Sequence, residues 1–123
     1  RLGERAREVT WLVGDITKVS LPAQAYDLWH DRAVLHFLVD PDAAAAYAAQ
    51  VRRCLVPGGH AVIGGFAPGG PERCSGLVVA RRSPRDVAAL LGPGFSLVGE
   101  ASEDHHTPSG ATQAFSWAVL KRI

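Results

Sequence analysis

Hydrophobic residues along the chain gather in short runs that are separated by polar segments and by glycine or proline. Five of these runs are short and rich in β-branched, aromatic or small apolar residues, a pattern typical of strands: residues 9–13, 26–29, 60–66, 95–103 and 111–121. Residues 107–110 form a turn signal between the last two runs. We therefore expect five strands, with a buried strand at 9–13 and an antiparallel hairpin at the end of the chain.

A first helix is predicted to begin at Asp40-Pro41-Asp42. Aspartate caps a helix, proline suits the first turn, and a second acidic residue favours the positive end of the helix dipole. Tyr47, Val51 and Leu55 recur every four residues, so one stripe of this helix is expected to pack on a sheet. Pro57-Gly58-Gly59 is expected to end the helix.

A second helix is predicted after Ser83-Pro84-Arg85-Asp86, which resembles a capping sequence, and is expected to end at Gly92. Residues 67–82 begin with several glycine and proline breakers and predict a long loop over one end of the sheet. Residues 1–8 are charged and are typical of the last turn of a helix. Strands and helices alternate early in the chain, as a parallel sheet with crossover helices requires, so the expected fold class is α/β.

Composition narrows the function classes. A chain of 123 residues with 47% hydrophobic and 20% charged residues fits one soluble globular domain. The 13 basic and 12 acidic residues form no basic block, so we expect no nucleic-acid partner. No apolar run approaches the roughly 20 residues of a membrane helix, so we expect no membrane association. Cys54 and Cys74 fit no disulfide framework, which predicts a cytoplasmic setting, and the first residue, Arg1, predicts that the chain begins within a longer protein.

Three motifs follow one another in the order and spacing of a known family: Val9-Thr10-Trp11-Leu12-Val13-Gly14-Asp15, Tyr26-Asp27-Leu28-Trp29-His30-Asp31-Arg32-Ala33-Val34 and Leu55-Val56-Pro57-Gly58-Gly59-His60. They resemble class I S-adenosylmethionine-dependent methyltransferases, in which a Gly-Asp pair ends the third strand, a Tyr-Asp or Phe-Asp pair opens the fourth, and Leu-x-Pro-Gly-Gly leads into the fifth. The loop at 66–77 resembles that of a bacterial subgroup of small methyltransferases with unassigned substrates. The resemblance implies a Rossmann-like methyltransferase sheet, mostly parallel with a C-terminal antiparallel hairpin.

The resemblance covers only part of the family's fold. The glycine-rich loop after the family's first strand, and the acidic residue that ends its second strand, have no counterpart here. We therefore interpret residues 1–123 as a partial methyltransferase domain, its C-terminal part, lacking the first strands of the family. In the family's strand order those strands lie between the third and the fourth. Their absence would leave strand edges unpaired and predicts a homo-oligomer formed through those edges.

The resemblance implies S-adenosylmethionine as cofactor and places it against six residues: Gly14, Asp15, Ile16, Asp31, Arg32 and His36. A carboxylate after a parallel strand, such as Asp15, lies where open α/β sheets bind ligands and can accept a hydrogen bond from the adenine amino group. The alternative is that Asp15 only caps a turn. Asp31 is the best candidate to face the methionine part of the cofactor; the alternative is that it caps the short helix around residues 34–38, a role it could also fill while it touches the ligand. His36 either faces the transferable methyl group or has a structural role.

The loop after the strand at 60–66 supplies the candidate substrate-binding residues Glu72, Arg73 and Cys74. Their side chains suit a polar or thiol-reactive substrate, and the alternative is that they are solvated or hold the loop's own shape. Cys74 could also join His105 and His106 in a metal site, but the spacing fits no compact zinc pattern, so no metal is predicted.

The function implied by the resemblance is S-adenosylmethionine-dependent methyl transfer to a small-molecule acceptor. In such an in-line displacement the protein mainly positions the donor and the acceptor in a dry crevice. We expect these residues alone to be incompetent for the reaction, and catalytic residues are not assigned. The alternative is a non-catalytic Rossmann-like interaction module or remnant. A dinucleotide dehydrogenase is disfavoured because Gly-x-Gly-x-x-Gly is absent.

Overall fold

The computed structural model describes residues 3–123. Its elements are, in chain order, η1 (Gly3–Glu8), β1 (Tyr26–Arg32), η2 (Leu35–Phe37), α1 (Pro41–Cys54), β2 (Leu55–Phe66), β3 (Arg73–Cys74), β4 (Leu77–Val78), α2 (Pro84–Leu91), β5 (Phe95–His106) and β6 (Thr112–Arg122), where η marks a 3-10 helix. The α/β class predicted from the alternation of strands and helices is confirmed.

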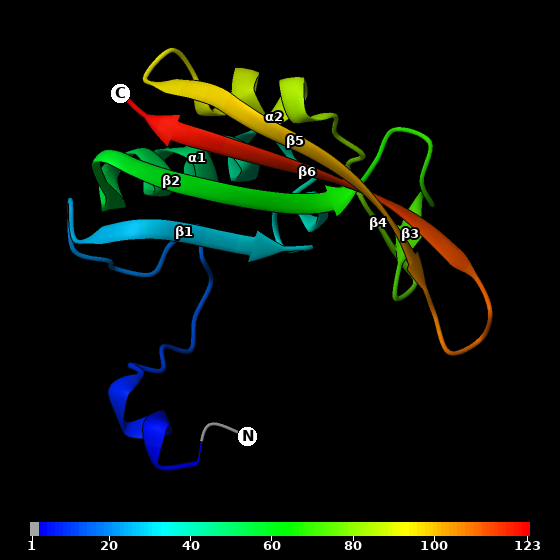
Figure 1. The fold of residues 1–123 in the computed structure, drawn as a ribbon, viewed down its shortest axis with the longest axis horizontal. Helices are drawn as coiled ribbons and strands as arrows, with labels where there is room; N and C mark the ends of the chain where they lie inside the picture. The colour runs from blue at the N-terminus through cyan, green and yellow to red at the C-terminus, as the bar shows by residue number, and fades with distance from the viewer. Residues whose placement is uncertain (1–2) are drawn as a thin grey trace.

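The main sheet has four strands in the order β1-β2-β6-β5 (Figure 1). β1 runs parallel to β2, and β6 runs antiparallel to both β2 and β5. The predicted C-terminal hairpin is confirmed, and its ladder reaches further than expected, to the pair His106 and Thr112. Within residues 3–123 the parallel part of the sheet is the β1–β2 pair, and β1 is an edge strand.

Helix α1 begins as predicted. The side chain of Asp40 accepts a hydrogen bond from the backbone N–H of Asp42 (3.2 Å), and Pro41 lies in the first turn. Tyr47 and Val51 are fully buried, which confirms that the predicted stripe packs on the sheet. Local capping and a four-residue apolar repeat therefore account for this helix.

The helix ends at Cys54, earlier than the stop predicted at residues 57–59. The next residue is already extended and pairs with the start of β1. The Pro-Gly-Gly segment then makes a tight irregular turn within β2: Gly58 has a φ of +85°, and a Cβ at Gly59 would lie 3.0 Å from the carbonyl oxygen of Asp27. Pairing with β1, a contact between distant parts of the chain, thus shortens the helix.

Helix α2 carries the capping box that its sequence predicts. The Asp86 N–H donates to the Ser83 hydroxyl (3.1 Å), and the Ser83 N–H donates to the Asp86 carboxylate (2.8 Å). At the other end Gly92 has a φ of +90°, and its N–H donates to the carbonyl of Ala88 (3.0 Å). Both ends of the helix are therefore set by local hydrogen bonds.

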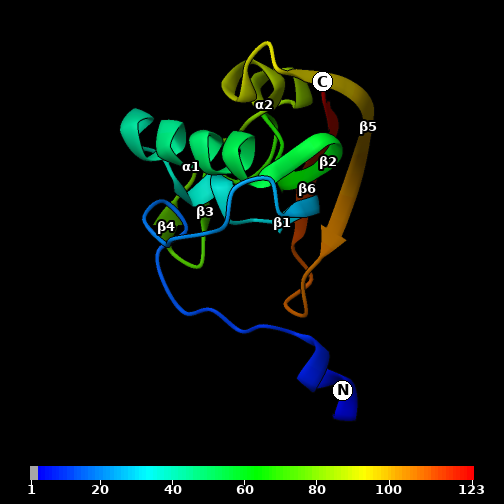
Figure 2. The same cartoon turned by 90° about the vertical axis from the view of Figure 1, so that its left-hand side faces the viewer.

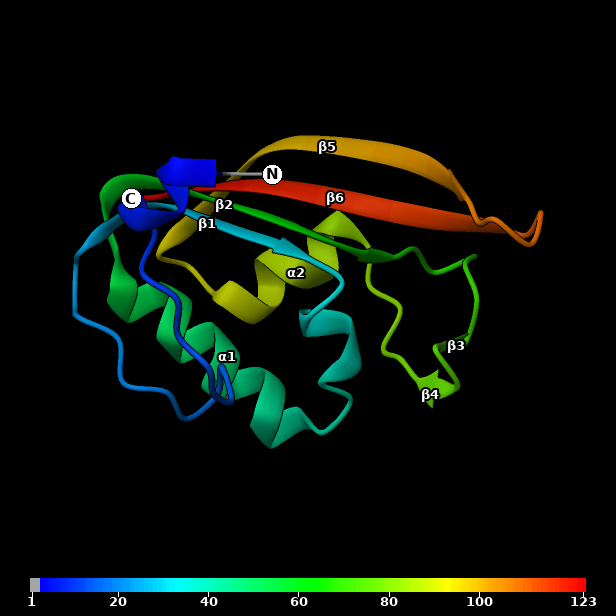
Figure 3. The same cartoon turned by 90° about the horizontal axis from the view of Figure 1, so that it is seen from below.

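Helices α1 and α2 and the short η2 lie on one side of the sheet, as the end view and the view from below show (Figures 2 and 3). The main core fills the space between these helices and the sheet, and its fully buried larger side chains are Tyr47, Val51, Leu55, Leu91 and Leu120. A second, smaller core of Phe66, Val79 and Phe115 lies where β2 ends. No described helix covers the opposite face of the sheet.

The prediction of a strand at residues 9–13 is wrong. These residues join no ladder in the described structure, and they run away from the sheet below β1 (Figure 1). Trp11 is 69% exposed and Val13 fully exposed, so the segment is not buried either. A strand exists only when its backbone groups find partners, and no described strand lies beside this segment.

Replacing Leu91 with alanine tests the main core. Leu91 is fully buried on α2, so Leu91→Ala is expected to lower the free energy of unfolding by about 2 to 5 kcal/mol. The matched control is Leu77→Ala, because Leu77 is 61% exposed and its truncation leaves no cavity. Urea denaturation measures both variants. Equal losses for the two leucines would contradict this assignment of the core.

Candidate functional site

An open crevice of about 370 Å³ lies along the C-terminal half of β1. It is lined by Gly14, Ile16, Trp29, His30, Asp31, Arg32, Val34 and Tyr47. Four of the six residues predicted to hold a cofactor come together here, from two motifs that are separate in the sequence. The crevice lies at the carboxyl end of a parallel strand, which is where open α/β sheets bind ligands.

Asp31 forms the floor of the crevice and is buried. Its carboxylate accepts hydrogen bonds from the backbone N–H groups of Val34 (2.8 Å) and Leu35 (3.0 Å), so it caps η2. It also accepts a hydrogen bond from the hydroxyl of Tyr47 (2.5 Å). Asp31 therefore makes the hydrogen bonds expected of a cap, and its carboxylate is held against the crevice wall.

Trp29 and Tyr47 complete this wall, and sequence reasoning missed both as site residues. The indole N–H of Trp29 donates to the Tyr47 hydroxyl (2.8 Å), and the two rings meet edge to face with centroids 5.4 Å apart. Burial, and then the negative charge of Asp31, raise the pKa of Tyr47, so its hydroxyl stays protonated. The only sequence signal was their aromatic character, which equally indicates core packing.

Asp15 lies beside the crevice on an exposed turn. One carboxylate oxygen, Oδ1, accepts hydrogen bonds from the Thr17 hydroxyl (2.7 Å) and the Thr17 N–H (2.8 Å). These bonds lower the pKa of Asp15, because both stabilise the charged form. The turn-capping role is thus present in the structure, and Oδ2 makes no hydrogen bond within residues 3–123.

The loop that carries Gly14 and Ile16 is fixed by a residue that sequence reasoning missed. Gln50 on α1 is buried, and its amide donates to the carbonyls of Ile16 (3.0 Å) and Val19 (2.7 Å). A polar residue beside the apolar stripe of α1 was the only signal. Helix α1 therefore positions both the floor of the crevice, through Tyr47, and its rim.

His36 lies apart from the crevice. It is buried on η2, packs between Phe37 and Phe66, and its Nδ1 accepts a hydrogen bond from the Phe66 N–H (3.1 Å). Its Nε2 has no partner among the described residues. Burial lowers the pKa of His36, an effect that the nearby Asp31 charge opposes and Arg82 reinforces. A neutral ring with its proton on Nε2 fits these contacts.

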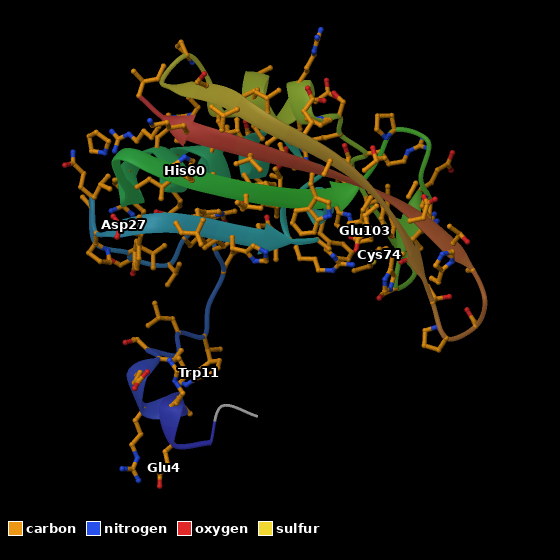
Figure 4. All side chains as sticks on the ribbon, in the orientation of Figure 1. Glu4, Trp11, Asp27, His60, Cys74 and Glu103 are labelled. Atoms are coloured by element: carbon orange, nitrogen blue, oxygen red, sulfur yellow. The ribbon has the colours of Figure 1, made fainter. Side chains whose placement is uncertain are left out.

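Glu72, Arg73 and Cys74 lie in and beside the small β3–β4 hairpin, beyond the end of β2 and outside the crevice (Figures 1 and 4). Arg73 donates to the carbonyl of Gly76 (3.1 Å), and Glu72 faces Arg81 at 3.9 Å. The half-buried Cys74 packs against the smaller core. In this structure the three side chains contact residues of their own loop or of the smaller core.

No group of three or more His, Cys, Asp or Glu side chains among the described residues could hold a metal ion. No helix within residues 3–123 is long and apolar enough to cross a membrane.

Residues 1–63 of the chain match the family model described as a methyltransferase domain. The chain belongs to this family. The match contains all three motifs and most of β2, and so covers every residue that lines the crevice. No curated protein matches the chain.

Solved structures share the fold of this methyltransferase-domain chain. A SAM-dependent methyltransferase from Methanosarcina mazei superposes with a TM-score of 0.75 at 13% identity, covering 91% of this chain and 66% of that one. The N-methyltransferase NodS from Bradyrhizobium japonicum, in complex with S-adenosyl-L-homocysteine, gives 0.71 at 20% identity over 97% of this chain and 58% of that one.

A third structure is the 1,6-didemethyltoxoflavin-N1-methyltransferase of Burkholderia thailandensis, with 1,6-didemethyltoxoflavin and S-adenosylhomocysteine bound. It gives a TM-score of 0.73 at 21% identity and covers 98% of this chain and 54% of that one. The chain therefore spans between 54% and 66% of the length of these three proteins. At such identities the likeness shows a shared fold.

The buried His36 predicts a pH-dependent stability. Its pKa lies below the ordinary value of 6.5, so below pH 6.5 the unfolded chain binds a proton that the folded chain does not. The free energy of unfolding is expected to fall as pH drops below 6.5, by at most about 1.4 kcal/mol per pH unit, and to level off below the lowered pKa.

The measurement is urea denaturation between pH 7.5 and pH 4.5, a range set by the reference pKa of about 6.5. His36→Gln, which does not titrate, should flatten the slope just below pH 6.5, whereas His106→Gln on the exposed hairpin should keep it. An unchanged slope in His36→Gln would show that another group is responsible.

Proposed function

We propose that the chain is the C-terminal part of a methyltransferase that uses S-adenosylmethionine and methylates a small molecule. The observation that carries the proposal is the crevice, which gathers Gly14, Ile16, Asp31 and Arg32 at the carboxyl end of β1. The family match supports it. Two of the neighbouring structures hold S-adenosylhomocysteine, which is the product expected of this cofactor.

The residues of the crevice fit such a cofactor. Gly14 and Ile16 offer backbone groups and an apolar side chain at the rim, and Asp15 keeps a free carboxylate oxygen beside them. The exposed Arg32 guanidinium lies at the other end, and Asp31 holds the floor. When bound, the cofactor supplies a methyl group on a positively charged sulfur. The residues of this chain hold and orient it and shield one side of it from water.

We propose supporting roles for His36 and for the loop residues Glu72, Arg73 and Cys74. His36 anchors the end of β2 through Phe66, and the Ala80 N–H donates to the carbonyl of His36 (2.7 Å), so the long loop is tied to η2. We propose that the loop shapes the acceptor side of the site from this anchor. Cys54 and Cys74 are both free thiols, which supports a cytoplasmic location.

Cofactor binding tests the proposal. S-adenosylhomocysteine is expected to bind this chain weakly, because no residue of the chain corresponds to the family's ribose-binding acid, and to bind a protein with the complete family fold in the low micromolar range. In that complete protein Asp15→Ala should weaken binding about tenfold, because the adenine amino group loses an acceptor.

The control is Asp27→Ala, which removes the same charge at the opposite end of β1 (Figure 4). Isothermal titration calorimetry gives the affinities, and thermal melting checks the fold. If Asp15→Ala lowers the melting temperature and leaves the affinity unchanged, Asp15 serves only its turn.

The alternative, a non-catalytic interaction module, is favoured by one observation. β1 is an edge strand, and Val9, Trp11, Leu12 and Val13 are between 40% and fully exposed. The backbone groups of both segments lack sheet partners on at least one side, so each segment can add to a strand of another copy. We propose that the chain forms homo-oligomers through these edges.

Association is therefore expected to depend on concentration. Light scattering of the 123-residue chain over a dilution series should show dimers or larger species that dissociate on dilution. Trp11→Lys should weaken association, because it places a charge in the exposed segment, whereas Arg7→Lys in η1 should not. A monodisperse monomer across the whole series would contradict the proposal.

A further inference from the structure

A cluster of charged and aromatic side chains lies on the face of the sheet that no described helix covers. The Arg32 guanidinium pairs with the Glu103 carboxylate at 3.1 Å. The same guanidinium lies over the rings of Phe115 (4.4 Å to the centroid) and Trp117 (5.6 Å). The cluster joins the end of β1 to β5 and β6, and Figure 4 shows Glu103 at the end of the sheet toward which β1 points.

The aromatic part of the cluster is flat and tightly fixed. Gly64 of β2 lies opposite Trp117, and a Cβ at Gly64 would lie only 2.6 Å from the indole, so the ring lies directly on the strand. Phe115 stacks beside Trp117 at an interplanar angle of 22°, and His30 stacks on it at 29°, with centroids 5.9 Å apart. Glycine at position 64 therefore allows an aromatic floor on the open side of the sheet.

The charged part of the cluster has unused hydrogen-bonding capacity. Glu103 Oε1 accepts from both Arg32 Nη1 (3.1 Å) and the indole N–H of Trp117 (3.1 Å), which leaves Oε2 without a partner in the described residues. The bond from Trp117, then that from Arg32, lowers the pKa of Glu103, so the carboxylate is charged. Both charged side chains are close to half exposed. The carboxylate of Glu103, which accepts hydrogen bonds, and the guanidinium of Arg32, which donates them, thus lie side by side above the aromatic floor.

We propose that this cluster binds the methyl acceptor, and that the acceptor is a flat heteroaromatic molecule whose rim carries a ring N–H next to a carbonyl oxygen. The carbonyl accepts from Arg32, the ring N–H donates to Glu103, and the ring stacks over Trp117 and His30. His30 and Arg32 also line the crevice, so the two sites share an edge. That the bound molecule is the methyl acceptor rests on the proposed function. That the cluster binds a molecule of this kind does not.

Lumazine, a bicyclic heteroaromatic dione with a ring N–H between two carbonyls, is the probe. The chain has three tryptophans, so its amide NMR spectrum holds three indole N–H signals. Lumazine is expected to shift the Trp117 signal in a saturable way and to leave that of Trp11, which lies far from the sheet, unchanged (Figure 4). 1,3-Dimethyllumazine lacks the N–H and should bind about tenfold more weakly.

Two variants test whether lumazine binding needs the charged side chains as well as stacking on the rings. Glu103→Ala should weaken lumazine binding about tenfold, whereas Glu100→Ala, which removes the same charge from the other face of β5, should not. Arg32→Met, which keeps the length of the side chain without the charge, should also weaken it. Thermal melting confirms that each variant is folded. Equal affinities for lumazine and its dimethyl form, or for wild type and Glu103→Ala, would overturn the proposal.

Titration of lumazine and of S-adenosylhomocysteine into a protein with the complete family fold distinguishes the two proposals. In that protein, lumazine binding without S-adenosylhomocysteine binding would leave this site standing and refute the cofactor crevice. S-adenosylhomocysteine binding without a shift of Trp117 by lumazine would refute this site alone.

Discussion

The buried carboxylate of Asp31 is the contact on which the rest of the structure depends. It ties the end of β1 to η2 through two backbone N–H groups and to α1 through the hydroxyl of Tyr47. A buried charge is costly unless it is fully hydrogen-bonded, so this arrangement is stable only when all three elements are in place. The crevice wall, the turn that carries His36 and the anchor of the long loop all follow from it.

Local signals in the sequence were sufficient for the starts of α1 and α2 and for the end of α2. Asp40, Ser83 and Gly92 act within a few residues of themselves, and each has its predicted role. The strand predicted at 9–13 failed because a strand needs a partner from elsewhere in the chain, which a short apolar run does not reveal. The early end of α1 has the same cause, since pairing with β1 overrides the helical pattern.

The candidate site, too, could be predicted from the sequence only in part. The first motif, with Ile16 directly after it, and the second motif brought Gly14, Ile16, Asp31 and Arg32 to one crevice. The sequence could not show that the Asp31 carboxylate is used within the fold. The contact between Arg32 and Glu103 joins residues 71 positions apart, and its geometry depends on the register of the closing hairpin. The alternating pattern around Trp117 does not say which face of the sheet is covered.

The alternation of β1 explains how one short motif serves two purposes. Successive side chains of a strand point to opposite faces, so Asp31, which lies opposite Ile63 of the main core, faces the helices. His30 and Arg32 on either side of it face the open side of the sheet and reach Trp117. The residue that fixes the fold and the residues free to meet a ligand are therefore neighbours, and a shift of β1 by one position would exchange their roles. The irregular turn at Gly58 and Gly59 precedes the regular pairing of β1 with β2, so it helps to set that register and with it the site.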